Sequence, residues 1–113
     1  MNLGYILQIL IALFFFAVGL CVSQVSVIHF NSEWNAENSF NIDELNDCEK
    51  SDVVICDSPE LKDKHKILSV PTIIIFDNGN EITRFEANIM MQLEATRKEI
   101  QKEIEKIHLA KFE

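Results

Sequence analysis

The segment that most restricts the fold of this chain is LSVPTIIIFDNGNEITRF, residues 68–85. Two apolar, β-branched runs, VPTIIIF and EITRF, flank the turn sequence DNGN at residues 77–80. An Asn-Gly pair between two such runs is the strongest short-range signal for a β-hairpin. We therefore expect two antiparallel strands here, with Pro71 at the entrance to the first.

Two further segments predict strands. Residues 24–30, QVSVIHF, alternate apolar and polar side chains and include several β-branched residues. Residues 52–56, DVVIC, form a short apolar run of the kind found in buried strands. Cys56 would then be a buried, unreactive thiol.

Capping signals predict three helices between and after these strands. Asn41 with Glu44 and Thr96 with Glu99 match the capping box, and Pro59 follows a Ser cap. The first helix should end near residue 48 and the second near residue 66. In the last helix the core-facing residues recur at helical spacing: Ile100, Ile104 and Ile107. The predicted order is β-α-β-α-β-β-α, an α/β fold with a mixed four-stranded sheet.

An uncharged apolar segment, residues 3–22, precedes these elements. About 20 residues at ~1.5 Å per residue match the ~30 Å hydrocarbon core of a bilayer. We therefore expect residues 1–23 to be a single-pass transmembrane anchor and residues 24–113 to be the folded domain. The alternative is a signal sequence that is removed before Gln24, which would make the domain secreted or lumenal. No Lys or Arg precedes Lys50 to mark the side of the membrane on which the domain lies.

The charge balance and the cysteines exclude some classes of function. Eighteen acidic and ten basic residues give a net charge of −8, which argues against nucleic acid as a partner. The three cysteines, Cys21, Cys48 and Cys56, are too few and too irregular for a disulfide scaffold. No pair among the cysteines and His29 and His65 has the short spacing of a zinc site, so we expect neither metal nor cofactor. No small-molecule substrate is evident either.

The order of elements, together with Val70-Pro71-Thr72 at the start of the hairpin, resembles the thioredoxin family. The likeness is greatest over residues 52–87, and FNSEW at residues 30–34 resembles the segment before the family's active site. The resemblance implies that Pro71 follows a cis peptide bond. It also implies that the backbone of Val70 is exposed and pairs with an extended peptide.

The same resemblance implies that the redox chemistry is missing. The family's Cys-x-x-Cys would follow Trp34, but this chain reads NAEN at residues 35–38. Disulfide exchange needs a thiolate and a resolving thiol, and neither Asn35 nor Asn38 supplies one. His29 aligns with the family's buried acid. We expect a degenerate member of the family that is not an enzyme.

Each degenerate position has alternative interpretations. His29 is either a core histidine bonded to a neighbour or a base paired with Ser32. Asn35 and Asn38 either form a recognition surface or cap the following helix. Trp34 either contacts a partner or shields the end of a strand.

The stretch ANIMMQLEA, residues 87–95, is longer than the family pattern requires. It contains an apolar cluster suited to adaptable interfaces: Ile89, Met90, Met91 and Leu93. Either this stretch starts the last helix early and packs on the sheet, or it contacts a partner.

These observations favour a membrane-tethered, non-catalytic thioredoxin-like domain that acts as a protein-binding or structural subunit, part of a larger membrane assembly. Its candidate contact residues are Val70, Pro71 and the apolar cluster of residues 89–93. The first alternative is an atypical thiol redox protein that uses Cys48 or Cys56. The second is a secreted or lumenal chaperone-like module that remains after signal cleavage.

Overall fold

The alternating segment at the start of the domain forms strand β1, Val25–Asn31, at the centre of the sheet. The computed structural model describes residues 24–112. Within this range no helix is long and apolar enough to cross a bilayer. The expected anchor, residues 3–22, lies outside the described residues.

The predicted hairpin is present as β3, Thr72–Asp77, and β4, Asn80–Glu86. Asn78 and Gly79 in its turn both have positive φ, 51° and 84°. These are the values that a type I′ turn demands and that Asn and Gly accept at low cost. The hairpin prediction is confirmed.

The four strands form one mixed sheet in the order β2-β1-β3-β4. β2, Glu49–Val54, is parallel to β1, whereas β1 and β3, like β3 and β4, are antiparallel. This is the four-stranded mixed sheet that the sequence predicts. β2 begins three residues earlier than expected and ends before Cys56, which lies in the following turn.

The connection from β1 to β2 differs from the prediction. In place of a helix over residues 41–48 it has two short 3₁₀ helices, η1, Glu33–Asn38, and η2, Ile42–Glu44. The Asn41 side chain accepts a hydrogen bond from the Asp43 N–H, so it does cap η2. After Glu44 the chain turns, with Asp47 at φ 63°, and this ends any further helix.

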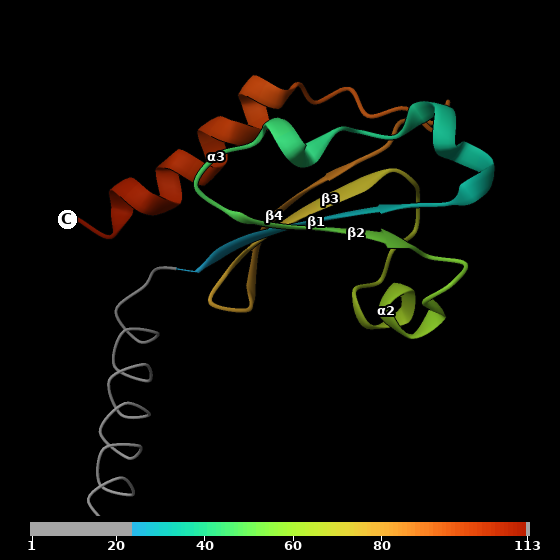
Figure 1. Cartoon of the computed structure of the whole chain (residues 1–113), viewed down its shortest axis with the longest axis horizontal. Helices are drawn as coiled ribbons and strands as arrows, with labels where there is room; N and C mark the ends of the chain where they lie inside the picture. The colour runs from blue at the N-terminus through green and yellow to red at the C-terminus, as the bar shows by residue number, and fades with distance from the viewer. Residues whose placement is uncertain (1–23, 113) are drawn as a thin grey trace, which may run out of the picture.

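The sheet separates two apolar clusters. On one face α3, Arg97–Ala110, and the 3₁₀ helices cover the sheet, and on the other lies α2, Pro59–Lys64 (Figure 1). The first cluster contains Val25, Val27, Ile42, Leu45, Ile73, Ile75, Ile100 and Ile104. The second contains Phe30, Ile67, Val70, Ile74 and Phe76. β3 supplies both clusters because its residues alternate between the two faces.

Helix α3 starts where the capping box places it. The Thr96 side chain accepts a hydrogen bond from the Glu99 N–H, at 3.2 Å. Ile100 and Ile104 are fully buried, and Ile107 packs beside them. Gln101, also buried, accepts from the Asn46 N–H and donates to the Asn46 carbonyl. These two bonds join α3 to the loop after η2.

Candidate functional site

The loop between α2 and β3 carries Pro71. The Val70–Pro71 peptide bond is cis, as the resemblance implies, and both side chains are buried. The Thr72 hydroxyl donates a 2.7 Å hydrogen bond to the Ser69 carbonyl, which closes the loop across the proline. Among residues 24–112, the Val70 carbonyl accepts one hydrogen bond and the Val70 N–H donates none.

The donor to the Val70 carbonyl is Asn35, the residue that the resemblance predicts in place of the first cysteine of a Cys-x-x-Cys. Asn35 lies at a kink inside η1 and is 95% buried, with 5% of its surface exposed. Its Nδ2 lies 3.2 Å from the Val70 carbonyl oxygen and 3.1 Å from the Met91 carbonyl oxygen. A third acceptor is Asn31 Oδ1, at 3.2 Å. Asn35 therefore joins the end of β1, the proline loop and the segment after β4.

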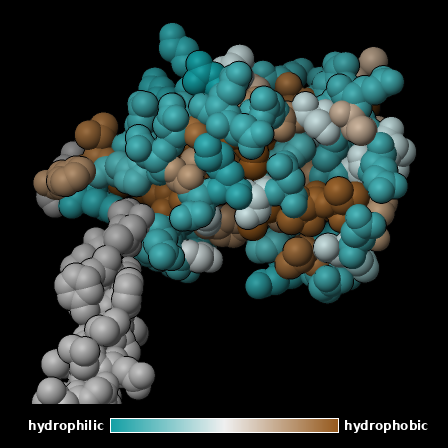
Figure 2. Space-filling model, in the orientation of Figure 1, coloured by the Kyte–Doolittle hydropathy of each residue, from teal (hydrophilic) through white to brown (hydrophobic). Residues whose placement is uncertain are grey.

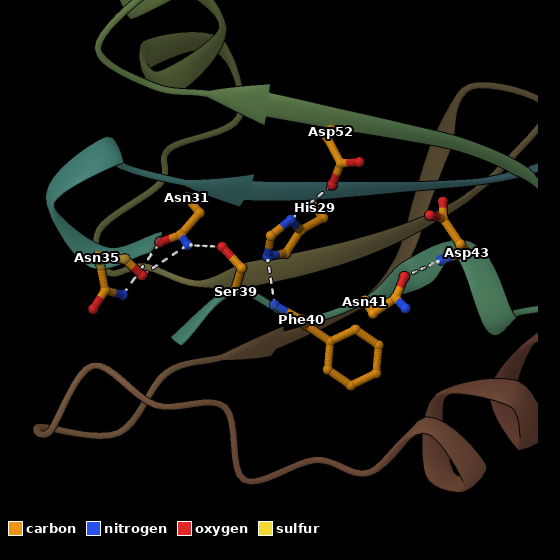
Figure 3. A network of polar contacts seen from close by, with 8 residues as sticks. All are labelled: His29, Asn31, Asn35, Ser39, Phe40, Asn41, Asp43 and Asp52. Carbon is orange, nitrogen blue, oxygen red and sulfur yellow. Dashed lines mark hydrogen bonds and ion pairs between the residues drawn. The ribbon is translucent and has the colours of Figure 1, made fainter. Parts of the chain in front are cut away.

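Further hydrogen bonds between side-chain amides hold the Asn35 carboxamide in one orientation, and Figure 3 draws those that involve Asn31. Asn38 donates to Asn35 Oδ1 at 2.8 Å, so both polar atoms of the Asn35 side chain are bonded. Asn31 Nδ2 donates to the Asn35 carbonyl and to the Ser39 hydroxyl. Backbone carbonyls can only accept, so the nitrogen of Asn35 must be the atom that faces Val70 and Met91.

Neither predicted role describes Asn35. Because the Asn35 side chain is buried, it cannot form a recognition surface. It does not cap the following helical turn either; Asn41 does. Local sequence could not show this, since two of its acceptors lie 35 and 56 residues further along the chain. Asn38 lies within η1 and serves as the partner of Asn35.

His29 is 4% exposed and bonded on both ring nitrogens. Nδ1 lies 2.8 Å from an oxygen of Asp52, its partner across the β1–β2 ladder. Nε2 accepts from the Phe40 N–H at 3.2 Å (Figure 3). A backbone N–H only donates, so Nε2 carries no proton and Nδ1–H donates to Asp52. The core interpretation is thus confirmed, and Ser32 contacts Cys56 rather than His29.

A groove of about 500 Å³ opens beside the proline loop. Trp34 lines this groove with 64% of its surface exposed, which leaves the ring accessible to a partner. Leu68 and Ile89 also line the groove and are 89% and 96% exposed. One charged side chain, Lys62, is among the lining residues that the structure describes. The surface of this groove is therefore mainly apolar.

The stretch of residues 87–95 is irregular, and α3 does not begin until Arg97. The expectation of an early helix start is therefore wrong. Met90 and Met91 are exposed, like Ile89, whereas Leu93 packs against the first apolar cluster. The cluster predicted from the sequence is thus divided between solvent and core.

Asn88 fixes the shape of this stretch. Its side chain accepts hydrogen bonds from the Met90 and Gln92 N–H groups, and its backbone N–H donates to the Gln92 carbonyl. Met91 adopts a positive φ of 59°, which is uncommon for a residue with a side chain. This backbone directs the Met91 carbonyl at Asn35. Asparagine is a common turn residue and no motif around Asn88 distinguishes it, so the sequence prediction missed it.

The cysteines of the described domain do not form a pair. Cys48 and Cys56 are both free. Cys48 packs against the first cluster, and burial there raises the pKa of its thiol. Cys56 is exposed in the groove, with Sγ 4.0 Å from Ser32 Oγ. The prediction of a buried Cys56 is wrong because β2 ends two residues before it.

The part of the chain described here has no group of three or more His, Cys, Asp or Glu side chains that could hold a metal ion.

The sequence prediction also missed Leu68 as a groove residue. An isolated leucine after a helix carries no signal that distinguishes a core position from an exposed one.

No family model matches the chain, and no curated protein matches it. Solved structures do. Thioredoxin-2, a component of malaria parasite protein secretion machinery, is 21% identical with a TM-score of 0.61, over 74% of this chain and 84% of its own. Thioredoxin 1 from the thermophilic eubacterium Thermosipho africanus TCF52B is 19% identical with a TM-score of 0.57, over 78% and 99%.

A mutant thioredoxin from Halobacterium salinarum NRC-1 is 16% identical, with a TM-score of 0.56 over 74% of each chain. Identities this low establish the fold and not the chemistry. The order of strands, the cis Val70–Pro71 bond and these three likenesses agree. The domain formed by residues 24–112 has a thioredoxin-like fold.

Proposed function

We propose that this protein is a membrane-tethered, non-catalytic binding or structural subunit with a thioredoxin-like fold. The observation that carries the proposal is the Asn35 carboxamide. It fills the position beside the proline loop where a redox member of the family would present its thiol. There it bonds to the backbone of Val70 and Met91.

The chemistry of this position supports a non-catalytic role. Thiol–disulfide exchange requires a thiolate that attacks a disulfide and a second thiol that resolves the mixed disulfide. Asn38 Nδ2 already donates to Asn35 Oδ1, and Asn35 Nδ2 already donates to the backbone carbonyls of Val70 and Met91. These two side chains are suited to fixing the geometry of a surface, and not to transferring electrons.

The groove supports protein binding. Its exposed apolar side chains come from three separate segments, represented by Trp34, Leu68 and Ile89. Large exposed apolar residues that converge on one hollow are typical of interaction surfaces. The Val70 N–H, which donates no hydrogen bond within residues 24–112, is the donor that the family resemblance assigns to pairing with an extended chain. Asn35 connects two residues that line this groove, Val70 and Met91.

Membrane attachment rests on the sequence. Residues 3–22 have the length and composition of a transmembrane helix. A tether of this kind raises the local concentration of the groove near other membrane proteins, so that weak contacts suffice for assembly.

Site-specific photo-crosslinking tests the binding role. A photoreactive residue at position 89 of the full chain, in the cells that naturally express it, should give a discrete adduct with one partner protein. The same residue at position 82 is the matched control, because Ile82 is also exposed and does not line the groove. The adduct should disappear in Trp34→Ala. Equal labelling from both positions, or no adduct at all, would contradict the proposal.

One observation favours a second candidate function. The Cys56 thiol lies exposed in the groove, where it could form a mixed disulfide with a bound partner. Cys48 is unsuitable as its resolving thiol, because it packs in the cluster that α3 covers. A redox role would therefore be limited to single-thiol chemistry. Loss of the position-89 adduct in Cys56→Ser would favour this alternative.

The third candidate, a lumenal or secreted module, differs from the proposal only in the fate of residues 1–23. Sequencing the mature N-terminus separates the two. Met1 or Asn2 as the first residue supports the anchor, and Gln24 supports cleavage.

A further inference from the structure

The end of α3 and the turn that follows it expose two large apolar side chains, Leu109 and Phe112. Leu109 is 65% exposed and Phe112 is 88% exposed, although the same helix buries Ile100 and Ile104. Residues three apart in a helical turn lie on the same side, and the Phe112 N–H donates to the Leu109 carbonyl, which keeps the turn helical to this point. Figure 2 shows apolar side chains at the end of the molecule where α3 ends. A single exposed leucine needs no explanation, but this adjacent pair does.

This apolar pair lies beside the point where the chain enters the domain. The Gln24 carbonyl accepts a 2.9 Å hydrogen bond from the Asn78 N–H in the β3–β4 turn. The neighbouring residue, Asp77, holds the Lys111 ammonium at 2.7 Å. Lys111 immediately precedes Phe112. Two contacts therefore connect the end of α3 to Gln24, and the uncharged segment of residues 3–22 ends two residues before Gln24.

We propose that Leu109 and Phe112 insert into the boundary between lipid headgroups and acyl chains, next to the anchor. This inference rests on the membrane attachment proposed above. Leu and Phe on one side of a short helical end are the side chains that such interfacial contacts use. The anchor brings them to the bilayer at high effective concentration, so that two side chains suffice for contact.

The contact does not require anionic lipid. The acidic side chain one turn before Leu109 is Glu105, and the chain carries a net charge of −8. Lys111 is held by Asp77 and adds little attraction for anionic headgroups. The contact therefore depends on burial of apolar surface, and phosphatidylcholine should support it.

The contact would also orient the groove. Ser32 and Trp34, which line the groove, follow the carboxyl end of β1, whereas Gln24 precedes its amino end. A seven-residue strand at ~3.3 Å per residue separates the two by roughly 20 Å. With Leu109 and Phe112 on the membrane, the groove faces away from the bilayer and meets soluble partners or the soluble domains of membrane proteins.

Fluorescence quenching in phosphatidylcholine vesicles tests the inference with the full chain. Trp34 is the single tryptophan. In a Trp34→Phe background, Phe112→Trp places the reporter at the proposed contact and Ile89→Trp places it at the groove. Lipid brominated on the acyl chain should remove about half of the fluorescence from position 112 and little from position 89. Equal quenching at the two positions would overturn the inference.

Flotation of the same vesicles separates the two proposals. Flotation with quenching at position 112 supports both. Flotation without quenching there overturns the lipid contact and leaves the membrane attachment in place. Failure to float overturns both.

A second measurement retains the native side chains. A phosphatidylcholine with a photoreactive group in its acyl chain should label the peptide that contains Leu109 and Phe112. The double variant Leu109→Ser, Phe112→Ser should lose this label while it still floats, because the anchor is unchanged. Labelling that persists in the double variant would contradict a specific contact by these two side chains.

Discussion

Replacing Asn35 with alanine should lower the stability of the domain by about 2–4 kcal/mol. The change removes the donor to the Val70 and Met91 carbonyls, which lie 3.2 and 3.1 Å from its nitrogen. A hydrogen bond contributes about 1 kcal/mol net, and a buried group left without its partner costs about 1–3 kcal/mol. For a total stability of about 5–15 kcal/mol, this is a large fraction.

Urea unfolding of the full chain in non-ionic detergent measures the loss. The fluorescence of Trp34, the single tryptophan, reports the transition from the neighbouring position. With an m-value of about 2 kcal/mol/M, the midpoint should fall by about 1–2 M urea. A loss smaller than about 0.5 kcal/mol, the range of ordinary surface substitutions, would refute the role given to this side chain.

Two matched variants separate hydrogen bonding from packing. Asn35→Asp keeps the size of the side chain but places an acceptor against two carbonyls, so it should destabilise the domain at neutral pH at least as much as alanine does. Acidification should narrow its difference from the wild type, because a protonated carboxyl donates a hydrogen bond. Asn38→Ala removes one bond to Asn35 and should cost only about 1 kcal/mol.

Three other predictions concern the histidines and cysteines. His29→Phe should cost about 1–3 kcal/mol in urea unfolding, because it leaves the Phe40 N–H without its acceptor; an unchanged midpoint would contradict this. Burial holds the pKa of His65 in the folded domain below its ordinary 6.5, so the contribution of His65 to stability is complete above pH 6.5 and is lost as the pH falls from there through the lower folded-state pKa. Unfolding at about pH 7.5 and about 5.5 should therefore show a smaller acid loss for His65→Phe than for the wild type, and equal losses would be inconsistent with the shift. Cys56 should be alkylated faster than Cys48, because Cys56 is exposed and burial raises the pKa of the Cys48 thiol. Mass spectrometry after a short iodoacetamide pulse measures the order, and faster alkylation of Cys48 would contradict this prediction.

Local signals predicted most of the fold. The Asn-Gly turn fixed the hairpin, and the cap at Thr96 fixed the start of α3. Both depend on residues within a few positions of each other, where backbone preferences and side-chain bonds act directly. The helix expected after Asn41 is reduced to one short 3₁₀ turn. Asn41 does cap that turn, but the residues after it, through Asp47, favour turns.

Long-range contacts explain what the sequence did not reveal about the site. The resemblance predicted Asn35 in place of a thiol, but the hydrogen-bond partners of Asn35 at Val70 and Met91 are distant in sequence. The same holds for Leu68, whose exposure depends on where the proline loop meets the groove. Residue type alone separates neither a structural amide from a recognition amide nor a core leucine from a surface one.

The most direct test of a non-catalytic thioredoxin-like domain is the reduction of insulin disulfides. The full chain in non-ionic detergent, supplied with dithiothreitol, should reduce insulin no faster than dithiothreitol alone. The same assay with Cys48→Ser, Cys56→Ser isolates the position held by Asn35. A rate above the uncatalysed one that survives this double substitution would contradict the account.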